Sequence, residues 1–176
     1  LMLAAANSDK LVAKFGKNNV VSLGLTLVCA GMLLFTTVDV GTEYFRIALT
    51  FFILGLGMGL TMAPSTTMVM DSIPEDKAGV GSATNDASRE VGGALGIAIG
   101  GSVLNDVYQN SLVVPEGLEV FSPVVTESFP AAMRIGGQLL NEGNVLGSFL
   151  IENARLAFME GMVGSAMVNA GVAFIT

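Results

Sequence analysis

The sequence predicts an all-α integral membrane protein built as a helical bundle. Of its 176 residues, 52% are hydrophobic and only 13% are charged, whereas soluble domains carry about 25% charged residues. Four runs have roughly the 20 apolar residues that a helix needs to cross a bilayer. A helix also pairs its backbone polar groups within its own segment, which lipid requires. The expected spans are residues 20–38, 47–70, 79–104 and 157–176.

The loops beside the first two spans predict the topology. The loop of residues 8–19 is lysine-rich, and the positive-inside rule places it in the cytoplasm. Residues 39–46 are then external, residues 71–78 are cytoplasmic, and residues 105–156 are external. The basic cytoplasmic loop is defined by Lys10, Lys14 and Lys17.

The second span combines glycines, a proline and methionines. Gly55 and Gly59 are four residues apart, a spacing that lets another helix approach closely. Pro64 removes a backbone hydrogen bond, and nearby hydroxyls such as that of Thr66 are available to the freed carbonyls. Methionines such as Met62 form a flexible, polarisable surface. Two interpretations stay open, ordinary helix packing and a substrate path that includes Met62 and Thr66.

The third span is the least apolar. It reads GVGSATNDASREVGGALGIAIGGSVL and contains Asn85, Asp86, Arg89 and Glu90. A charge at the centre of a bilayer costs at least about 2.5 kcal/mol, so membrane charges are candidates for ion or solute movement. The sequence therefore predicts a functional polar segment here.

The spacing within this segment indicates how its charges interact. Asp86 and Glu90 lie one helical turn apart and repel each other, while Arg89 is placed to neutralise one of them. One arginine beside two acids suggests a site that loads and releases a single proton. The alternative is a cytoplasmic helix end that projects its charges into water. Asn85 shares a helix face with Arg89 and is a weaker candidate for the substrate path.

Glycines crowd the second half of the same span. Dense small residues on one side of a span predict close packing against another helix. Such a surface also permits sliding or rocking, which suits a moving protein. The candidates for packing are Gly92, Gly93 and Gly96.

The segment of residues 105–156 is acidic and periodic. Residues 129–140 and 145–157 show helical periodicity on either side of Gly143. The sequence predicts a solvated external loop with two amphipathic helices. A gate or lid over an external mouth is the alternative.

Composition excludes several kinds of protein. There is no histidine and a single cysteine, Cys29, so we expect no metal site, no disulfide and no cofactor. A membrane-embedded enzyme would have only the carboxylate pair to work with. The net charge is −7 and no Lys/Arg-rich block is present, so we expect no nucleic-acid partner.

At this point the third span and its neighbours resemble a known family. The run GVGSATNDASREVGGALG, the preceding GLGMGLTMAPSTTMVMDSIPEDKAG and the loop SDKLVAKFGK resemble the last helices of the fourteen-helix drug–proton antiporters of the major facilitator superfamily (EmrB/QacA type). The resemblance is specific through residues 50–104 and weak through residues 105–155. It identifies this chain as similar to the last four helices of a major facilitator half.

The resemblance implies an inner-membrane exporter that exchanges protons for lipophilic or cationic compounds, with the proton gradient as its energy source. Asp86 and Glu90 match positions at which membrane carboxylates would couple the two movements, with Arg89 as their charge partner. Its partners would be the substrate, protons, membrane lipid and the N-terminal helices of a parent chain. The alternatives are a metabolite or lipid-precursor exporter of the same superfamily and a non-transporting membrane scaffold. The apolar ends LMLAAAN and GVAFIT further suggest a piece of a larger transporter.

Overall fold

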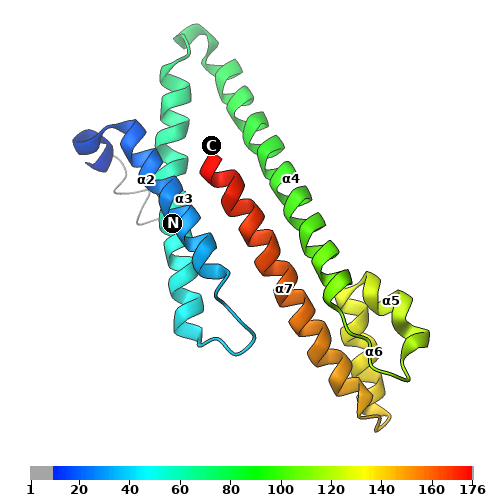
Figure 1. Ribbon diagram of the computed structural model, residues 1–176. Helices are drawn as coiled ribbons and strands as arrows, with labels where there is room; N and C mark the ends of the chain where they lie inside the picture. Colours follow the sequence, from blue (N-terminus) through cyan, green and yellow to red (C-terminus); the bar gives the residue numbers. More distant parts are fainter. Residues whose placement is uncertain (1–9, 176) are drawn as a thin grey trace.

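The computed structural model describes residues 10–175, and this part of the chain is helical with short connections (Figure 1). The apolar residues 1–7, expected to end a preceding membrane helix, lie outside the described residues. Residues 10–15 are helical, and α2 then runs from Lys17 to Phe35. The expected cytoplasmic loop of residues 8–19 is therefore mostly helix where it is described.

Four helices are long and apolar enough to cross a membrane. The chain is thus an integral membrane helical bundle, as the composition predicts. Three of the four follow α2 and are longer than the expected spans. They are α3 (Tyr44–Asp71), α4 (Ala78–Ser111) and α7 (Leu146–Ile175).

The two longest helices differ from the expected boundaries. α4 has 34 residues and continues past Leu104 to Ser111, and α7 begins at Leu146 instead of Ala157. At 1.5 Å per residue, α4 is about 50 Å long, which exceeds the bilayer core of about 30 Å. The amphipathic helix expected at residues 145–157 is therefore no separate element, because it continues into the last span.

The remaining elements are short and lie at the ends of the long helices. The 3₁₀ turn η1 (Glu75–Lys77) joins α3 to α4. Beyond α4, η2 (Glu119–Phe121) and α5 (Ser122–Glu127) lead to α6 (Phe129–Asn141). Gly143, with a φ of 78°, turns the chain between α6 and α7, so the predicted break at this glycine is confirmed.

The long helices lie side by side in the order α3, α2, α7, α4 (Figure 1). α2 packs along α3, and α7 packs against both α2 and α4. α3 and α4 meet at η1 and then diverge, and the carboxyl end of α7 lies between them (Figure 1). Residues 72–77 and 36–43 lie at opposite ends of the helices, as a chain that crosses a membrane repeatedly requires.

Glycines set the closest approach between α2 and α3. A Cβ built on Gly57 would lie 2.7 Å from the carbonyl oxygen of Gly24 and 2.8 Å from the backbone nitrogen of Val28. A Cβ on Gly24 would in turn lie 2.9 Å from the carbonyl oxygen of Gly57. The two backbones touch at this point, a contact that only small residues permit. At one end of these two helices, Lys17 at the start of α2 forms an ion pair with Asp71 at the end of α3.

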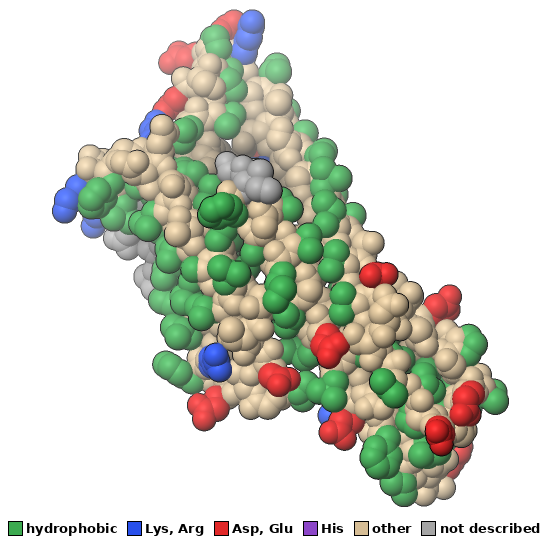
Figure 2. Space-filling view, in the orientation of Figure 1, with side chains coloured by type: hydrophobic (Ala, Val, Ile, Leu, Met, Phe, Trp, Pro, Cys, Tyr) green, Lys and Arg blue, Asp and Glu red, His purple; other side chains and the backbone are tan. Residues whose placement is uncertain are grey.

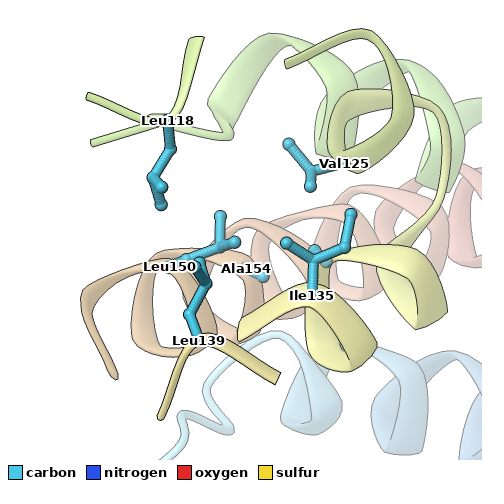
Figure 3. Packing of buried hydrophobic residues seen from close by; sticks show 7 residues of the cluster. Leu118, Val125, Ile135, Leu139, Leu150 and Ala154 are labelled. Carbon is cyan, nitrogen blue, oxygen red and sulfur yellow. The ribbon is translucent and has the colours of Figure 1, made fainter. Parts of the chain in front are cut away.

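A separate hydrophobic core lies beyond the carboxyl end of α4. We call this part, from Leu112 to Ala154, the cap. Side chains from the turn before η2, from α5 and α6 and from the start of α7 converge in it (Figure 3). Val125, Leu150 and Ala154 are fully buried. The other buried members are Leu118, Ala132, Ile135 and Leu139.

Aromatic and polar contacts join the cap to α4 and α7. The Tyr108 hydroxyl donates to the carbonyl oxygen of Val125 at 2.8 Å. The Phe129 ring meets Tyr108 edge-on at 6.2 Å and stacks on Phe158 at 4.4 Å. The Asn153 amide donates to the carbonyl oxygen of Val113 at 2.9 Å. These contacts fix the cap on the ends of the two helices.

Replacing Tyr108 by phenylalanine should destabilise the cap by about 1 kcal/mol, because the buried carbonyl of Val125 loses its donor. We expect faster amide hydrogen exchange in α5, measured on the chain in nanodiscs. Tyr44→Phe is the matched control, since the Tyr44 side chain is 84% exposed. Equal exchange in the two variants would contradict the predicted role of this hydrogen bond.

The turn before η2 is held by a carboxylate. The backbone N–H of Gly117 donates to both carboxylate oxygens of Glu119 at 3.0 Å. This bond, together with the backbone N–H of Glu119 itself, lowers the pKa of the Glu119 carboxyl below its usual value. The contribution is present while the carboxylate is charged and is lost as the pH falls through the lowered pKa. Gly117 has a φ of 93°, which suits glycine.

Acidic side chains gather on the cap. On the face shown in Figure 2, red atoms concentrate around α5, α6 and the start of α7, while the sides of the long helices are largely apolar. The acids of the predicted external segment are all exposed. They are Asp106, Glu116, Glu119, Glu127, Glu142 and Glu152.

Candidate functional site

The polar segment lies on the first half of α4, where this helix diverges from α3 (Figure 1). Asn85 is half-buried, and so is Gly96 on the same helix face. Asp86, Arg89 and Glu90 are exposed. The structure therefore covers Asn85 in part and leaves the three ionisable groups uncovered by the described residues.

The expected neutralisation of an acid by Arg89 is not formed in this conformation. Within residues 10–175, Lys17 and Asp71 make the single ion pair, so Arg89 pairs with neither Asp86 nor Glu90. The three charges share one helical turn, where changes of side-chain rotamer can bring them together. Their coupling role stays a prediction.

The glycines of α4 divide into two groups. A Cβ built on Gly92, Gly93 or Gly96 would meet nothing within 4 Å, so these positions face open space among the described residues. Gly100 is instead buried against α7, where a Cβ would lie 2.8 Å from both Ser165 Oγ and Asn169 Nδ2. Packing of the first group against a further helix stays a prediction.

On α3, the candidates for the substrate path lie one turn apart. The hydroxyl of Thr66 donates to the carbonyl oxygen of Met62 at 3.0 Å. The Met62 side chain is 44% exposed, and Thr66 is half-buried. α3 runs through Pro64 without interruption. The structure brings these two residues together on one helix and assigns them no ligand.

The predicted packing glycines of α3 are at least partly covered. Gly59 is buried, and Gly55 is half-buried. A backbone contact with α2 is made by Gly57, which lies between them and which the sequence analysis did not single out. Which glycine of α3 meets Gly24 depends on the partner helix, and the sequence of α3 holds no information about it.

The lysines of the basic segment differ in their contacts. Lys17 is half-buried and paired with Asp71, while Lys10 and Lys14 are exposed. The Lys14 ammonium lies 5.3 Å from the centre of the Phe15 ring. This segment and η1 lie toward the same end of the bundle (Figure 1), so both are placed on one side of the membrane.

Two polar residues of α7 were missed by the sequence analysis. Ser165 and Asn169 lie one turn apart and face α4 at Gly100. The amide of Asn169 inside an apolar run could have indicated a polar site, but an amide carries no charge and stands out less than an ionised group. No group of three or more potential metal ligands occurs among residues 10–175.

The arrangement suits a pathway for a solute better than a reaction centre. α4 presents polar and charged groups on its first half, small residues in its middle and, at Gly100, a glycine that packs beside two polar side chains of α7. Exposed charges in a membrane-crossing helix require water or protein partners, because lipid cannot stabilise them. The polar half of α4 therefore belongs beside an aqueous cavity or a further helix.

Comparison with known proteins agrees with this geometry. Residues 1–106 match the Major Facilitator Superfamily model. The multidrug efflux pump LfrA of Mycolicibacterium smegmatis is 27% identical over 172 residues, which cover 96% of this chain and 33% of LfrA. The multidrug transporter protein MdtP of Bacillus subtilis is 30% identical over 105 residues, covering 60% of this chain and 19% of MdtP.

A third relative covers a similar stretch. The methyl viologen resistance protein SmvA of Salmonella typhimurium is 26% identical over 153 residues, which are 85% of this chain and 30% of SmvA. The chain thus spans about a third or less of the length of these relatives. No solved structure matches it significantly. Because the family match covers more than half of its 176 residues, the chain belongs to the major facilitator superfamily.

Proposed function

We propose that these helices form the C-terminal part of a proton-coupled multidrug efflux transporter of the fourteen-helix type, which exports lipophilic or cationic compounds across the cytoplasmic membrane. The observation that carries the proposal is the exposed Asp86–Arg89–Glu90 segment in a membrane-crossing helix. The names of the relatives, among them a multidrug efflux pump and a methyl viologen resistance protein, support the substrate class.

In the proposed mechanism the two carboxylates share one positive partner. When Arg89 neutralises one acid, the other is left without a positive partner and carries the proton in this proposal. Exposure to water on the other side of the membrane lets that proton leave. A cationic substrate in the same water-filled space would compete with the proton, which couples the two movements.

Alternating access would expose the segment to each side in turn. The open glycine positions of α4 leave its middle free to pack against helices of the other half and to rock over them. In this proposal Met62, Thr66 and Asn85 line the path.

Neutral variants of the two acids test the proposal in the longer protein that carries these helices. We expect Asp86→Asn with Glu90→Gln to reduce proton-driven ethidium efflux from everted vesicles at least tenfold, because no group remains to exchange the proton. Asp76→Asn with Glu75→Gln is the matched control, since these exposed acids lie in η1, and it should transport normally. Efflux at the unmodified rate in the first variant would refute the coupling role of the two acids.

A further inference from the structure

A pocket opens between the long helices, away from the charged segment of α4. It has a volume of about 340 Å³ and is lined by residues of α2, α3, α4 and α7. Its α4 residue is Leu104, which lies 18 residues along the helix from Asp86, or about 27 Å at 1.5 Å per residue. The pocket is therefore distinct from the proposed proton site.

Four of the nine lining residues are aromatic or sulfur-containing. Phe35 and Phe51 meet edge-on, with ring centres 6.2 Å apart and planes at 66°. Met32 and Met162 also line the pocket. Aromatic rings and methionine sulfur interact favourably with a further aromatic ring, and methionine adapts to its shape. This lining favours a flat, aromatic occupant.

Two polar side chains of α7 also line the pocket. Ser165 and Asn169 each lie 2.8 Å from the position that a Cβ on Gly100 would occupy, so the absence of a side chain there makes room for them. Both residues are half-buried. An asparagine amide carries two N–H donors, so Asn169 can donate a hydrogen bond to an acceptor that enters the pocket.

We propose that this pocket binds a small aromatic compound of one or two rings that carries a carbonyl oxygen. The rings would lie among Phe35, Phe51 and the two methionines, and the carbonyl would accept a hydrogen bond from Asn169. Ligand pockets commonly combine an apolar lining with a few convergent polar groups, and 340 Å³ lies at the small end of their range of about 300–1,000 Å³. The inference concerns binding alone and does not depend on export.

Benzophenone tests the proposal, because it is a two-ring aromatic ketone that bonds covalently to nearby C–H groups on irradiation. The full 176-residue chain in nanodiscs would be irradiated with increasing benzophenone and mapped by mass spectrometry. We expect saturable labelling of Met32 and Met162. Met58 and Met167, which are 45% and 55% exposed, serve as internal controls for unsaturable labelling from the lipid.

Two variants separate the pocket from the lipid background. Asn169→Leu should raise the half-saturating concentration about fivefold, the loss of roughly one hydrogen bond. Ala166→Phe should abolish saturable labelling by filling the pocket. Asn110→Leu is the matched control, because Asn110 is exposed on α4 and bonds to Asp106. Labelling that never saturates, or that both pocket variants leave unchanged, would overturn the proposal.

The longer protein provides the second arm of the test. Saturable labelling of the same two methionines there would support a ligand site. Labelling that is present in the chain but lost in the longer protein would show that another membrane helix occupies the pocket, which would also overturn the proposal. Neither result depends on the efflux assay, so a failure here is distinguishable from a failure of the proposed transport function.

Discussion

Replacing Leu150 by alanine is expected to open the cap. Leu150 is fully buried in a cluster with Leu118 and with residues of α5 and α6 (Figure 3), and its truncation removes apolar contacts and leaves a cavity. Buried leucine-to-alanine changes cost 2–5 kcal/mol, and we expect about 3 kcal/mol here. Amide hydrogen-exchange protection in α5 and α6 should fall roughly a hundredfold, since exchange there requires the cap to open.

A second leucine of the cap provides the control. Leu140, on α6, is 43% exposed, so Leu140→Ala should change protection little. The long helices should keep their protection in both variants, because the cap core is separate from the contacts between α2 and α3. If Leu150→Ala exchanged as slowly as Leu140→Ala, the cap would have no core of its own.

The membrane-crossing helices were predictable because hydropathy and length report directly on lipid. The boundaries at the cap were not. A helix that leaves the bilayer changes from uniformly apolar to amphipathic, and residues 145–157 and 157–176 therefore looked like two elements. Gly147 lies in the first turn of α7, and residues 148–160 hold no glycine or proline that would stop the helix before Gly161. The absence of a stop signal was the better guide.

The candidate site was predictable at the level of residue types. Three charges in an apolar run stand out in any sequence, and the structure places them on the uncovered half of α4. Their pairing was not predictable, because rotamers depend on neighbours outside the helix. Asn169 and Ser165 were missed for the same reason. Their importance comes from facing Gly100 across a helix contact between distant segments.

Replacing Gly57 by leucine should separate α2 from α3. The built Cβ of Gly57 meets backbone atoms of Gly24 and Val28 at 2.7 and 2.8 Å, and backbone atoms cannot move aside as a flexible side chain would. Overpacking in a core costs about 1–3 kcal/mol, and we expect at least the upper value here. The transition of the chain in bicelles, titrated with sodium dodecyl sulfate, should shift to a clearly lower detergent fraction.

Gly92→Leu isolates the packing effect from the change in helix propensity. Both glycines lie inside helices, where leucine is intrinsically favoured by up to about 1 kcal/mol. A Cβ on Gly92 meets nothing within 4 Å in the described part of the chain, so its variant should unfold at the same detergent fraction or a slightly higher one. If Gly57→Leu behaved like Gly92→Leu, backbone contact at Gly24 would not hold the two helices together. Opposite shifts would show that glycine on α3 serves close approach, whereas on the middle of α4 it leaves a surface open.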